Sequence, residues 1–148
     1  MRFMKKAVAA GAILVAAMGG AVVSPTSASA AVTAPPPDGH LYAWLDINAG
    51  EYYHCRWVGN DDNWTNCTDW DGVARNMHDR ASSVQNRGYT KEVNLYNDAG
   101  QRGAWRCLSR GEFWPDLRNV RFNRGSSETG YNYPMENRIS SHLWVSSC

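Results

Sequence analysis

The sequence lacks a long apolar run after its first 30 residues, so nothing beyond them is long enough to span a bilayer. Those 30 residues have a basic start, an apolar run over positions 7–23 and the small residues Ala28-Ser29-Ala30. These are the three parts of a secretory signal peptide. We predict a signal peptide over residues 1–30, cleaved before Ala31, and a secreted, extracellular protein. A membrane anchor is the alternative, but the run is short and rich in glycine.

Positive charge is scarce in the rest of the chain. Residues 31–148 number 118, a length that suits one domain. They hold 12 of the 15 Lys and Arg against all 14 Asp and Glu, which gives a formal charge of −2. Of these 12 basic residues, Lys91 is the one lysine. A nucleic acid or an anionic membrane needs a basic surface to bind, so we expect neither as a partner.

Helical periodicity is also missing, because no stretch of about 10–15 residues after position 30 repeats apolar residues at helical spacing. Short runs of aromatic and β-branched residues, bounded by turn residues, take its place. They occupy residues 41–47, 52–58, 93–96 and 104–108. We predict an all-β domain in which residues 74–77 form one short helical turn.

The motifs HExxH, GxSxG and the P-loop do not occur in the sequence. The four histidines are scattered along the chain. A small secreted hydrolase or ribonuclease could pair a glutamate with a histidine and an arginine, and Glu51, Glu112 and Glu136 are available for it. No spacing selects one of these glutamates, so we predict that the protein is not an enzyme.

What the sequence does contain is a pattern that occurs twice. HDRASS at 78–83 and ENRISS at 136–141 each place a polar turn before a Ser-Ser pair and a strand-like run. Four upstream residues also recur at matching spacing, as Trp44, Tyr53, Cys55 and Gly59 and again as Tyr96, Trp105, Cys107 and Gly111. Two patterns in the same order indicate one supersecondary unit used twice. We predict two Greek keys packed as a sandwich of about eight strands.

The repeat also predicts the domain organisation. We expect one domain over residues 40–148, with halves at about 40–88 and 89–148. Residues 31–39 contain Pro35-Pro36-Pro37 and few bulky apolar residues. We predict that they form a flexible, proline-rich leader.

All four cysteines lie after the predicted signal peptide. An even number in a small exported domain indicates disulfides, and four cysteines allow three pairings. Of these we expect Cys55 with Cys67 and Cys107 with Cys148, which gives each half its own bridge. A zinc site is the alternative, but there is no CxxC pair and no cluster of histidines.

The two Ser-Ser turns resemble the signature of the βγ-crystallin fold, Asn/Asp-Asn/Asp-x-x-Ser/Thr-Ser. HDRASS and ENRISS match it at positions two, five and six and depart from it at position one. The resemblance implies two Greek keys and, by analogy with calcium-binding members, a calcium site at each turn. The ligands would be the backbone carbonyls of Arg80 and Arg138 and the hydroxyls of Ser82 and Ser140.

Two features argue against tight calcium binding at these turns. His78 and Glu136 stand where the signature has Asn or Asp, and each arginine side chain puts positive charge beside a proposed carbonyl ligand. We expect that no cofactor is required and that any calcium affinity is weak. For Ser82 and Ser140 we favour a structural role over calcium binding, with hydroxyls that bond backbone groups and hold the turn.

A narrower resemblance covers nearly all of residues 31–148. It rests on YYHCRWVGNDDNW at 52–64, RASSV at 80–84, VNLY at 93–96, GAWRCL at 103–108 and the closing segment Asn137 to Trp144. These strings resemble the secreted actinobacterial peptidase inhibitors typified by the streptomycete metalloproteinase inhibitor. The resemblance implies a βγ-crystallin-like domain whose partner is an extracellular protease, a zinc metalloendopeptidase. We expect the protein to be a monomer.

An inhibitor of this kind needs a rigid loop that enters the protease cleft. The loop closed by the expected Cys55–Cys67 bridge fits this need, and its proposed contact residues are Asn60, Asp61, Asp62, Asn63 and Trp64. Trp64 either anchors the contact or packs under its own loop, and the sequence leaves both open. The segment Gly125 to Asn132 is the second candidate loop, without a bridge of its own.

A binding module without inhibitory activity is the alternative function. Seven tryptophans and seven tyrosines permit stacking on the sugar rings of a cell-wall glycan, although they equally serve to fill a small core. Weak calcium binding at the Ser-Ser turns is the other form of this alternative.

Overall fold

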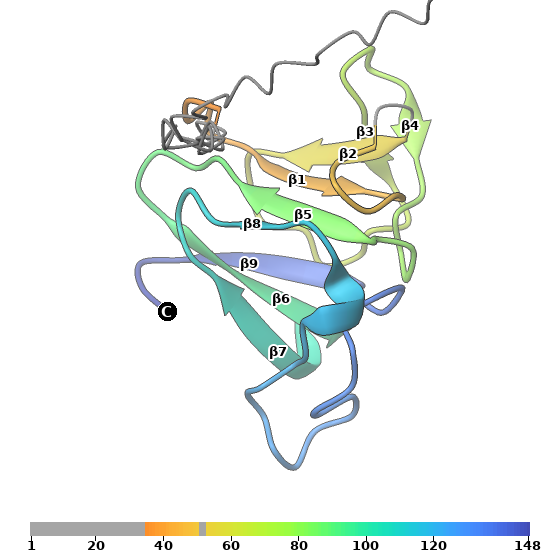
Figure 1. Cartoon of the computed structure of the whole chain (residues 1–148), viewed down its shortest axis with the longest axis vertical. Helices are drawn as coiled ribbons and strands as arrows, with labels where there is room; N and C mark the ends of the chain where they lie inside the picture. Colours follow the sequence, from red (N-terminus) through yellow and green to blue (C-terminus); the bar gives the residue numbers. More distant parts are fainter. Residues whose placement is uncertain (1–34, 51–52) are drawn as a thin grey trace, which may run out of the picture. The chain divides into compact units, whose positions relative to one another are not determined.

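A computed structural model describes residues 35–50 and 53–148, and these form nine antiparallel strands and one short 3-10 helix, Leu117–Asn119 (Figure 1). The strands are β1 (Leu41–Trp44), β2 (His54–Trp57), β3 (Cys67–Thr68), β4 (Ala74–Arg75), β5 (Ser83–Asn86), β6 (Glu92–Asp98), β7 (Arg102–Leu108), β8 (Phe113–Trp114) and β9 (Ser141–Val145). The predicted signal peptide and residues 31–34 of the leader lie outside the described residues. No helix in the described part of the chain is long and apolar enough to cross a membrane.

The strands form two sheets. The first has the order β4-β3-β2-β1-β5-β8, and the second has the order β7-β6-β9. In Figure 1 the yellow and green strands of the first sheet lie above the teal and blue strands of the second. The central strands β1 and β6 occupy equivalent places, because β1 pairs with β2 and β5 while β6 pairs with β7 and β9. The predicted all-β, twofold-repeated architecture is therefore confirmed.

Each half also contributes backbone to the sheet of the other half. β8 belongs to the second half but pairs with β5 at the edge of the first sheet. Asp61 belongs to the first half but forms a bridge with His142 in β9 of the second sheet. These crossings are what make each half a Greek key, and they interlock the two keys.

The two sheets enclose one hydrophobic core. Its fully buried members come from both halves, and they include Leu41, Ala43, Val84, Val93, Leu95, Phe122, Met77 and Met135. The two methionines each lie one residue before a Ser-Ser turn motif, so the repeat places equivalent side chains in the core. Because the core is shared, neither half buries its apolar face alone.

The two Ser-Ser turns are joined by a reciprocal pair of backbone hydrogen bonds. The amide of Asp79 donates to the carbonyl of Ile139 over 3.1 Å, and the amide of Asn137 donates to the carbonyl of Ala81 over 3.0 Å. Asp79 and Asn137 both have positive φ, at 53° and 55°, which Asp and Asn tolerate better than most residues. The second position of each motif is thus selected by its backbone conformation.

The last serine of each motif ties its turn to the preceding hairpin. Ser83 Oγ donates to the carbonyl of Asp46 over 2.7 Å, and Ser141 Oγ donates to the carbonyl of Asp98 over 2.6 Å. Each hydroxyl also accepts a hydrogen bond from an amide in the same hairpin turn. Both serines are fully buried, so these bonds satisfy groups that water cannot reach.

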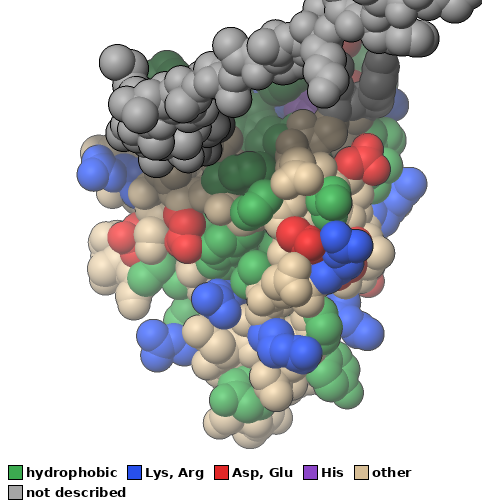
Figure 2. All heavy atoms as spheres, viewed as in Figure 1, with side chains coloured by type: hydrophobic (Ala, Val, Ile, Leu, Met, Phe, Trp, Pro, Cys, Tyr) green, Lys and Arg blue, Asp and Glu red, His purple; other side chains and the backbone are tan. Residues whose placement is uncertain are grey.

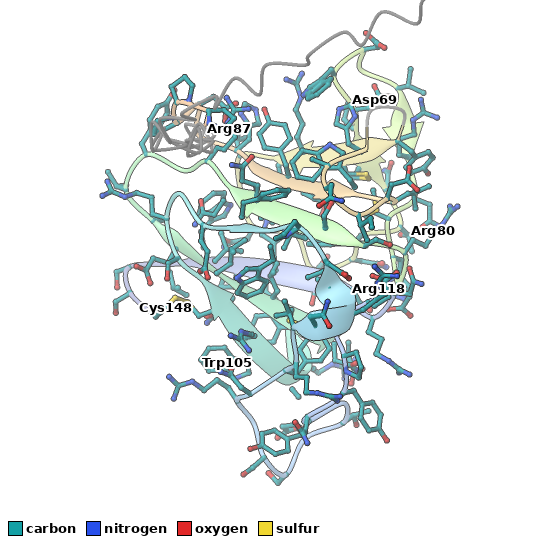
Figure 3. All side chains as sticks on the ribbon, viewed as in Figure 1. Asp69, Arg80, Arg87, Trp105, Arg118 and Cys148 are labelled. Atoms are coloured by element: carbon teal, nitrogen blue, oxygen red, sulfur yellow. A yellow bond between two sulfur atoms is a disulfide. The ribbon has the colours of Figure 1, made fainter. Side chains whose placement is uncertain are left out.

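Both expected disulfides are present, one in each half. Cys55 in β2 is bonded to Cys67 in β3, with Cα atoms 5.6 Å apart. Cys107 in β7 is bonded to Cys148 near the end of the chain, with Cα atoms 5.5 Å apart (Figure 3). The first bridge closes the loop that contains the proposed contact residues Asn60 to Trp64.

The predicted helical turn at residues 74–77 is wrong, because Ala74–Arg75 is strand β4 and pairs with β3. Asp69 provides the reason (Figure 3). Its buried carboxylate accepts hydrogen bonds from the amides of Asp71 and Val73 and forms an ion pair with Arg75. These bonds hold a tight turn that returns the chain beside β3. Asp and Asn favour such local turns over helix.

The described part of the predicted leader lies against the first half. The amides of Asp38 and Gly39 both donate to the carbonyl of Arg87, and the guanidinium of Arg87 pairs with the Asp38 carboxylate at 2.9 Å. Arg87 also donates to the carbonyl of Pro36. Residues 36–39 are therefore held by one residue at the end of the first half.

Replacing Ser83 or Ser141 with alanine is expected to lower the free energy of unfolding by about 2 kcal/mol, because each change leaves a buried carbonyl without its donor. Urea denaturation of each variant measures the loss. Ser126→Ala, at an exposed serine, serves as the control and should change stability by less than about 0.5 kcal/mol. Equal stability of all three variants would contradict this role.

Candidate functional site

The loop from Gly59 to Asn66 connects β2 to β3 and is mostly exposed. Its backbone is anchored on the second half of the domain. Asp61 and His142 exchange two backbone hydrogen bonds, and the Trp64 amide donates to the carbonyl of Ser140 over 2.9 Å. The amide of Gly100 donates to the carbonyl of Asp62 over 2.7 Å. The loop of one half is thus fixed in place by the other half.

Side chains within the loop add a second set of bonds. Asp61 accepts the indole N–H of Trp57 over 2.7 Å and the amide of Asn63 over 2.8 Å. The Asn60 side-chain oxygen accepts the amide of Trp144 over 2.9 Å. Bonds at successive residues leave the loop few alternative conformations, and a preordered loop loses little entropy when it binds.

Trp64 lies in the core, with none of its surface exposed. Its ring stacks on Trp57 with the centroids 4.5 Å apart and the planes 24° apart. Trp64 therefore packs under its own loop and is not exposed as a contact residue, which decides between the two roles that the sequence left open. The exposed contact surface that remains is made by the side chains of Asn60, Asp62 and Asn63, with Asp61 half-buried beside them.

His142 is the one residue of this region that sequence reasoning missed. It is fully buried in β9, and its imidazole touches both ends of the loop. Nδ1 accepts the indole N–H of Trp64 over 2.9 Å, while Nε2 lies 2.7 Å from the carbonyl of Gly59. A carbonyl oxygen can only accept, so the proton is on Nε2 and the ring is neutral. The sequence carries no signal for this role, because it depends on the crossing of the halves.

Burial lowers the pKa of His142 to about 4, and the hydrogen bond to Gly59 opposes this with a smaller effect. The charged form is disfavoured because the site excludes water. A protonated ring would also place a second N–H against the Trp64 indole N–H, where only an acceptor fits.

The remaining serines of the two turns bond carboxylates of the opposite half. Ser82 Oγ donates to Glu136 over 2.8 Å. Ser140 Oγ lies 2.7 Å from both the Asp79 carboxylate and the carbonyl of Asn97. We expected these hydroxyls to bond backbone groups, and only Ser140 does so, at Asn97. The carboxylate bonds instead join the two halves and strengthen the contact between the turns.

The same atoms allow a test of whether calcium fits. The second carboxylate oxygen of Glu136 is buried and has no hydrogen-bond partner among the described residues. The hydroxyls proposed as ligands are already bonded within the protein, Ser82 to the other oxygen of Glu136 and Ser140 to Asp79 and Asn97, whereas calcium needs about six to eight free oxygens. The guanidiniums of Arg80 and Arg138 lie over the rings of neighbouring tyrosines, 5.4 Å and 5.0 Å from their centroids. The residues therefore fit calcium only in part, and weak affinity stays a prediction.

The second candidate loop, Gly125 to Asn132, has no disulfide, but its backbone is held nonetheless. The amide of Ala104 in β7 donates to the carbonyl of Thr129, and the amide of Asn132 donates to that of Phe122. Tyr131 is 41% exposed and therefore offers this loop an aromatic contact that the first loop lacks.

On the face shown in Figure 2, Lys and Arg side chains are scattered among acidic and apolar ones rather than gathered in one patch.

Comparison with known proteins gives a family match. A family model described as peptidase inhibitor family I36 matches residues 30–108, which is more than half of the chain. The matched range contains the first half of the domain, the loop from Gly59 to Asn66 and the hairpin β6–β7. No curated protein matches the chain.

Solved structures resemble the chain in fold. One, from work on the evolution of the eye lens beta-gamma-crystallin domain fold, is 18% identical with a TM-score of 0.53, and the match covers 78% of this chain and 94% of that one. Spherulin 3a from Physarum polycephalum is 19% identical with a TM-score of 0.45, over 78% of this chain and 91% of that one. The first likeness supports the βγ-crystallin-like fold predicted from the Ser-Ser turns.

Stability is expected to fall as the pH drops from about 6.5 to 4, by about 3 kcal/mol from His142 alone. The folded-state pKa of His142 is lower than the unfolded value, so the unfolded chain takes up the proton first and is favoured by acid. Above pH 6.5 the neutral His142 contributes its full stabilisation. Well below pH 4 that stabilisation has been lost completely. Urea denaturation across this range measures it.

The matched control for this pH dependence is His142→Gln, which cannot titrate. Between pH 6.5 and 4.5 the stability of this variant should fall less steeply than that of the wild type, because it lacks the titrating imidazole. The loss that remains at lower pH comes mostly from carboxylates in both proteins. Parallel pH profiles of the two proteins would show that His142 is not buried as a neutral ring.

Proposed function

The chain belongs to peptidase inhibitor family I36, and from this premise we propose that it is a secreted inhibitor of a zinc metalloendopeptidase. The resemblance to the streptomycete metalloproteinase inhibitor supports this target class. Two disulfides in a small domain support an oxidising, extracellular location. Membership of an inhibitor family supports the prediction that the chain is not an enzyme and that its partner is a protease.

The contact segment in this proposal is the loop from Gly59 to Asn66. The single observation that carries the proposal is that this loop is exposed and yet bonded at successive residues to the domain beneath it. A rigid loop fills a cleft without losing much entropy, and it resists the bending that cleavage requires. The disulfide between Cys55 and Cys67 holds the end of the loop next to β2.

Asp62 gives the loop a chemical reason to select a zinc enzyme. Its side chain is exposed near the middle of the loop, while its backbone carbonyl is fixed by the amide of Gly100. Carboxylate oxygens are accepted zinc ligands, and a catalytic zinc keeps one coordination position open. We therefore propose that the Asp62 carboxylate is directed to the metal of the target protease.

Asp62→Ala is expected to raise the inhibition constant against a thermolysin-like protease at least tenfold, about 1.4 kcal/mol of binding free energy, because it removes the proposed ligand. The backbone bond to Gly100 remains in this variant. Steady-state inhibition assays measure the effect. Glu128→Ala removes an exposed carboxylate from the second candidate loop and should leave the constant unchanged.

A different pattern of losses would overturn the contact proposal. If Asp62→Ala inhibits like the wild type while Tyr131→Ala does not, the contact belongs to the second loop. If the wild type at equimolar concentration leaves zinc proteases fully active, the target class is wrong, and serine and cysteine proteases should then be assayed in the same way.

The binding module without inhibitory activity has one observation in its favour. A cleft of about 330 Å³ lies beside the segment that links the halves, and Tyr89, Lys91 and Trp144 contribute to its walls. Tyr89 is 63% exposed, which leaves a ring face free to stack on a sugar. Retention of the protein on insoluble cell-wall polysaccharide, together with no inhibition of any protease, would favour this alternative.

We expect calcium to be unnecessary for inhibition and to bind with a dissociation constant weaker than micromolar, because the hydroxyls of Ser82 and Ser140 are already bonded to carboxylates of the protein. Isothermal titration calorimetry with calcium chloride on the calcium-free protein checks this expectation. Glu136→Gln is the control, and it should remove whatever heat the wild type gives at the Ser82 turn. A micromolar or tighter site would show that the arginines do not weaken the turns.

A further inference from the structure

The proposed inhibitory loop and the residue that touches it most belong to different halves of the chain. Gly59 opens the loop, Trp64 lies near its end, and both bond the imidazole of His142. The backbone of His142 also exchanges hydrogen bonds with Asp61 between them, of 2.8 Å and 3.3 Å. One residue of β9 therefore makes four hydrogen bonds to three positions of the loop.

The chemistry of these bonds requires one acceptor and one donor at a fixed separation on a rigid ring. The Trp64 indole can only donate and the Gly59 carbonyl can only accept. A neutral imidazole with its proton on Nε2 meets both needs at once. A glutamine side chain reaches toward Gly59 with its N–H but does not hold an acceptor at the position of Nδ1.

Neighbouring aromatic rings keep the imidazole in this orientation. Trp57, Trp64 and Trp144 pack against it at steep angles, with centroid distances of 5.3 Å, 5.8 Å and 6.4 Å. The other two tryptophans also direct their indole N–H groups to the loop, Trp57 to the Asp61 carboxylate and Trp144 to the Gly59 carbonyl over 2.9 Å. The ring cannot turn without breaking this packing.

We propose that His142 is the positioning residue of the inhibitory loop, and that it sets from the second half the separation between the loop's two ends. The link from this position to inhibition rests on the proposed function, whereas the positioning of the loop by His142 does not. Removal of the imidazole breaks the one side-chain bridge that joins Gly59 to Trp64, and the remaining bonds from Trp144 and Ser140 hold each of them separately, so the residues between them become more mobile. Loss of inhibition then follows from loop mobility, while the rest of the domain stays folded.

Three variants separate positioning from a general loss of stability. His142→Leu removes both ring contacts, and His142→Gln restores a donor for Gly59 alone. Phe122→Ala is the matched control, since Phe122 is buried in the core of the second half and its truncation destabilises by a comparable amount without a bond to the loop. Urea denaturation first establishes how far each variant is destabilised.

Hydrogen exchange of the loop amides is the readout that a merely structural role would not move. In His142→Leu, the amides of Asp61 and Trp64 should exchange at least tenfold faster than in Phe122→Ala at equal global stability. His142→Gln should lie between His142→Leu and the wild type. In the wild type, nitrogen NMR of the imidazole should show a neutral ring protonated at Nε2, with Nδ1 as an acceptor.

Inhibition assays on the same proteins complete the experiment. The inhibition constant should rise at least tenfold in His142→Leu, less in His142→Gln, and not in Phe122→Ala. Loop exchange that matches the Phe122→Ala control, or a ring protonated at Nδ1, would overturn the positioning role. Fast loop exchange in His142→Leu together with a wild type that inhibits no protease would uphold the positioning and reject the proposed function instead.

Discussion

The structure depends on the reciprocal hydrogen bonds between its two Ser-Ser turns. Asp79 donates to Ile139, and Asn137 donates to Ala81, so each turn closes only against the other. Two serine–carboxylate bonds also cross between the halves, from Ser82 to Glu136 and from Ser140 to Asp79. With the turns joined, the third segment of each half is carried to the opposite sheet, where β8 meets β5 and Asp61 meets β9. The shared core and the crossed strands both follow from this one contact.

The functional consequence is that an exposed loop is fixed from two sides. The Cys55–Cys67 bridge belongs to the loop's own half, whereas the bonds from Ser140 and His142 come from the other half. A loop held only by its own hairpin would keep freedom to bend toward a cleavable conformation. Anchoring across the halves removes that freedom, which is what an inhibitor of a protease requires.

Much of the fold was predictable because the repeat is visible in local chemistry. Each half shows the same residue types: a turn residue with positive φ and a pair of serines at fixed spacing, together with a pair of cysteines. The disulfide pairing follows from this division into halves. The crossing of segments leaves no such mark, because hydrogen bonds between backbones are independent of side-chain type. The burial of Trp64 and the role of His142 both depend on that crossing. The β4 strand was missed for a related reason, since the buried Asp69 carboxylate overrides the local preference of residues 74–77.

Native-state hydrogen exchange at increasing urea tests most directly whether the two halves form one cooperative unit. If they do, the amides of Asp79 and Asn137 open with the same free energy, equal to that of global unfolding, because neither turn closes without the other. Exchange of one of these two amides through a lower-energy opening that leaves the other half protected would contradict it.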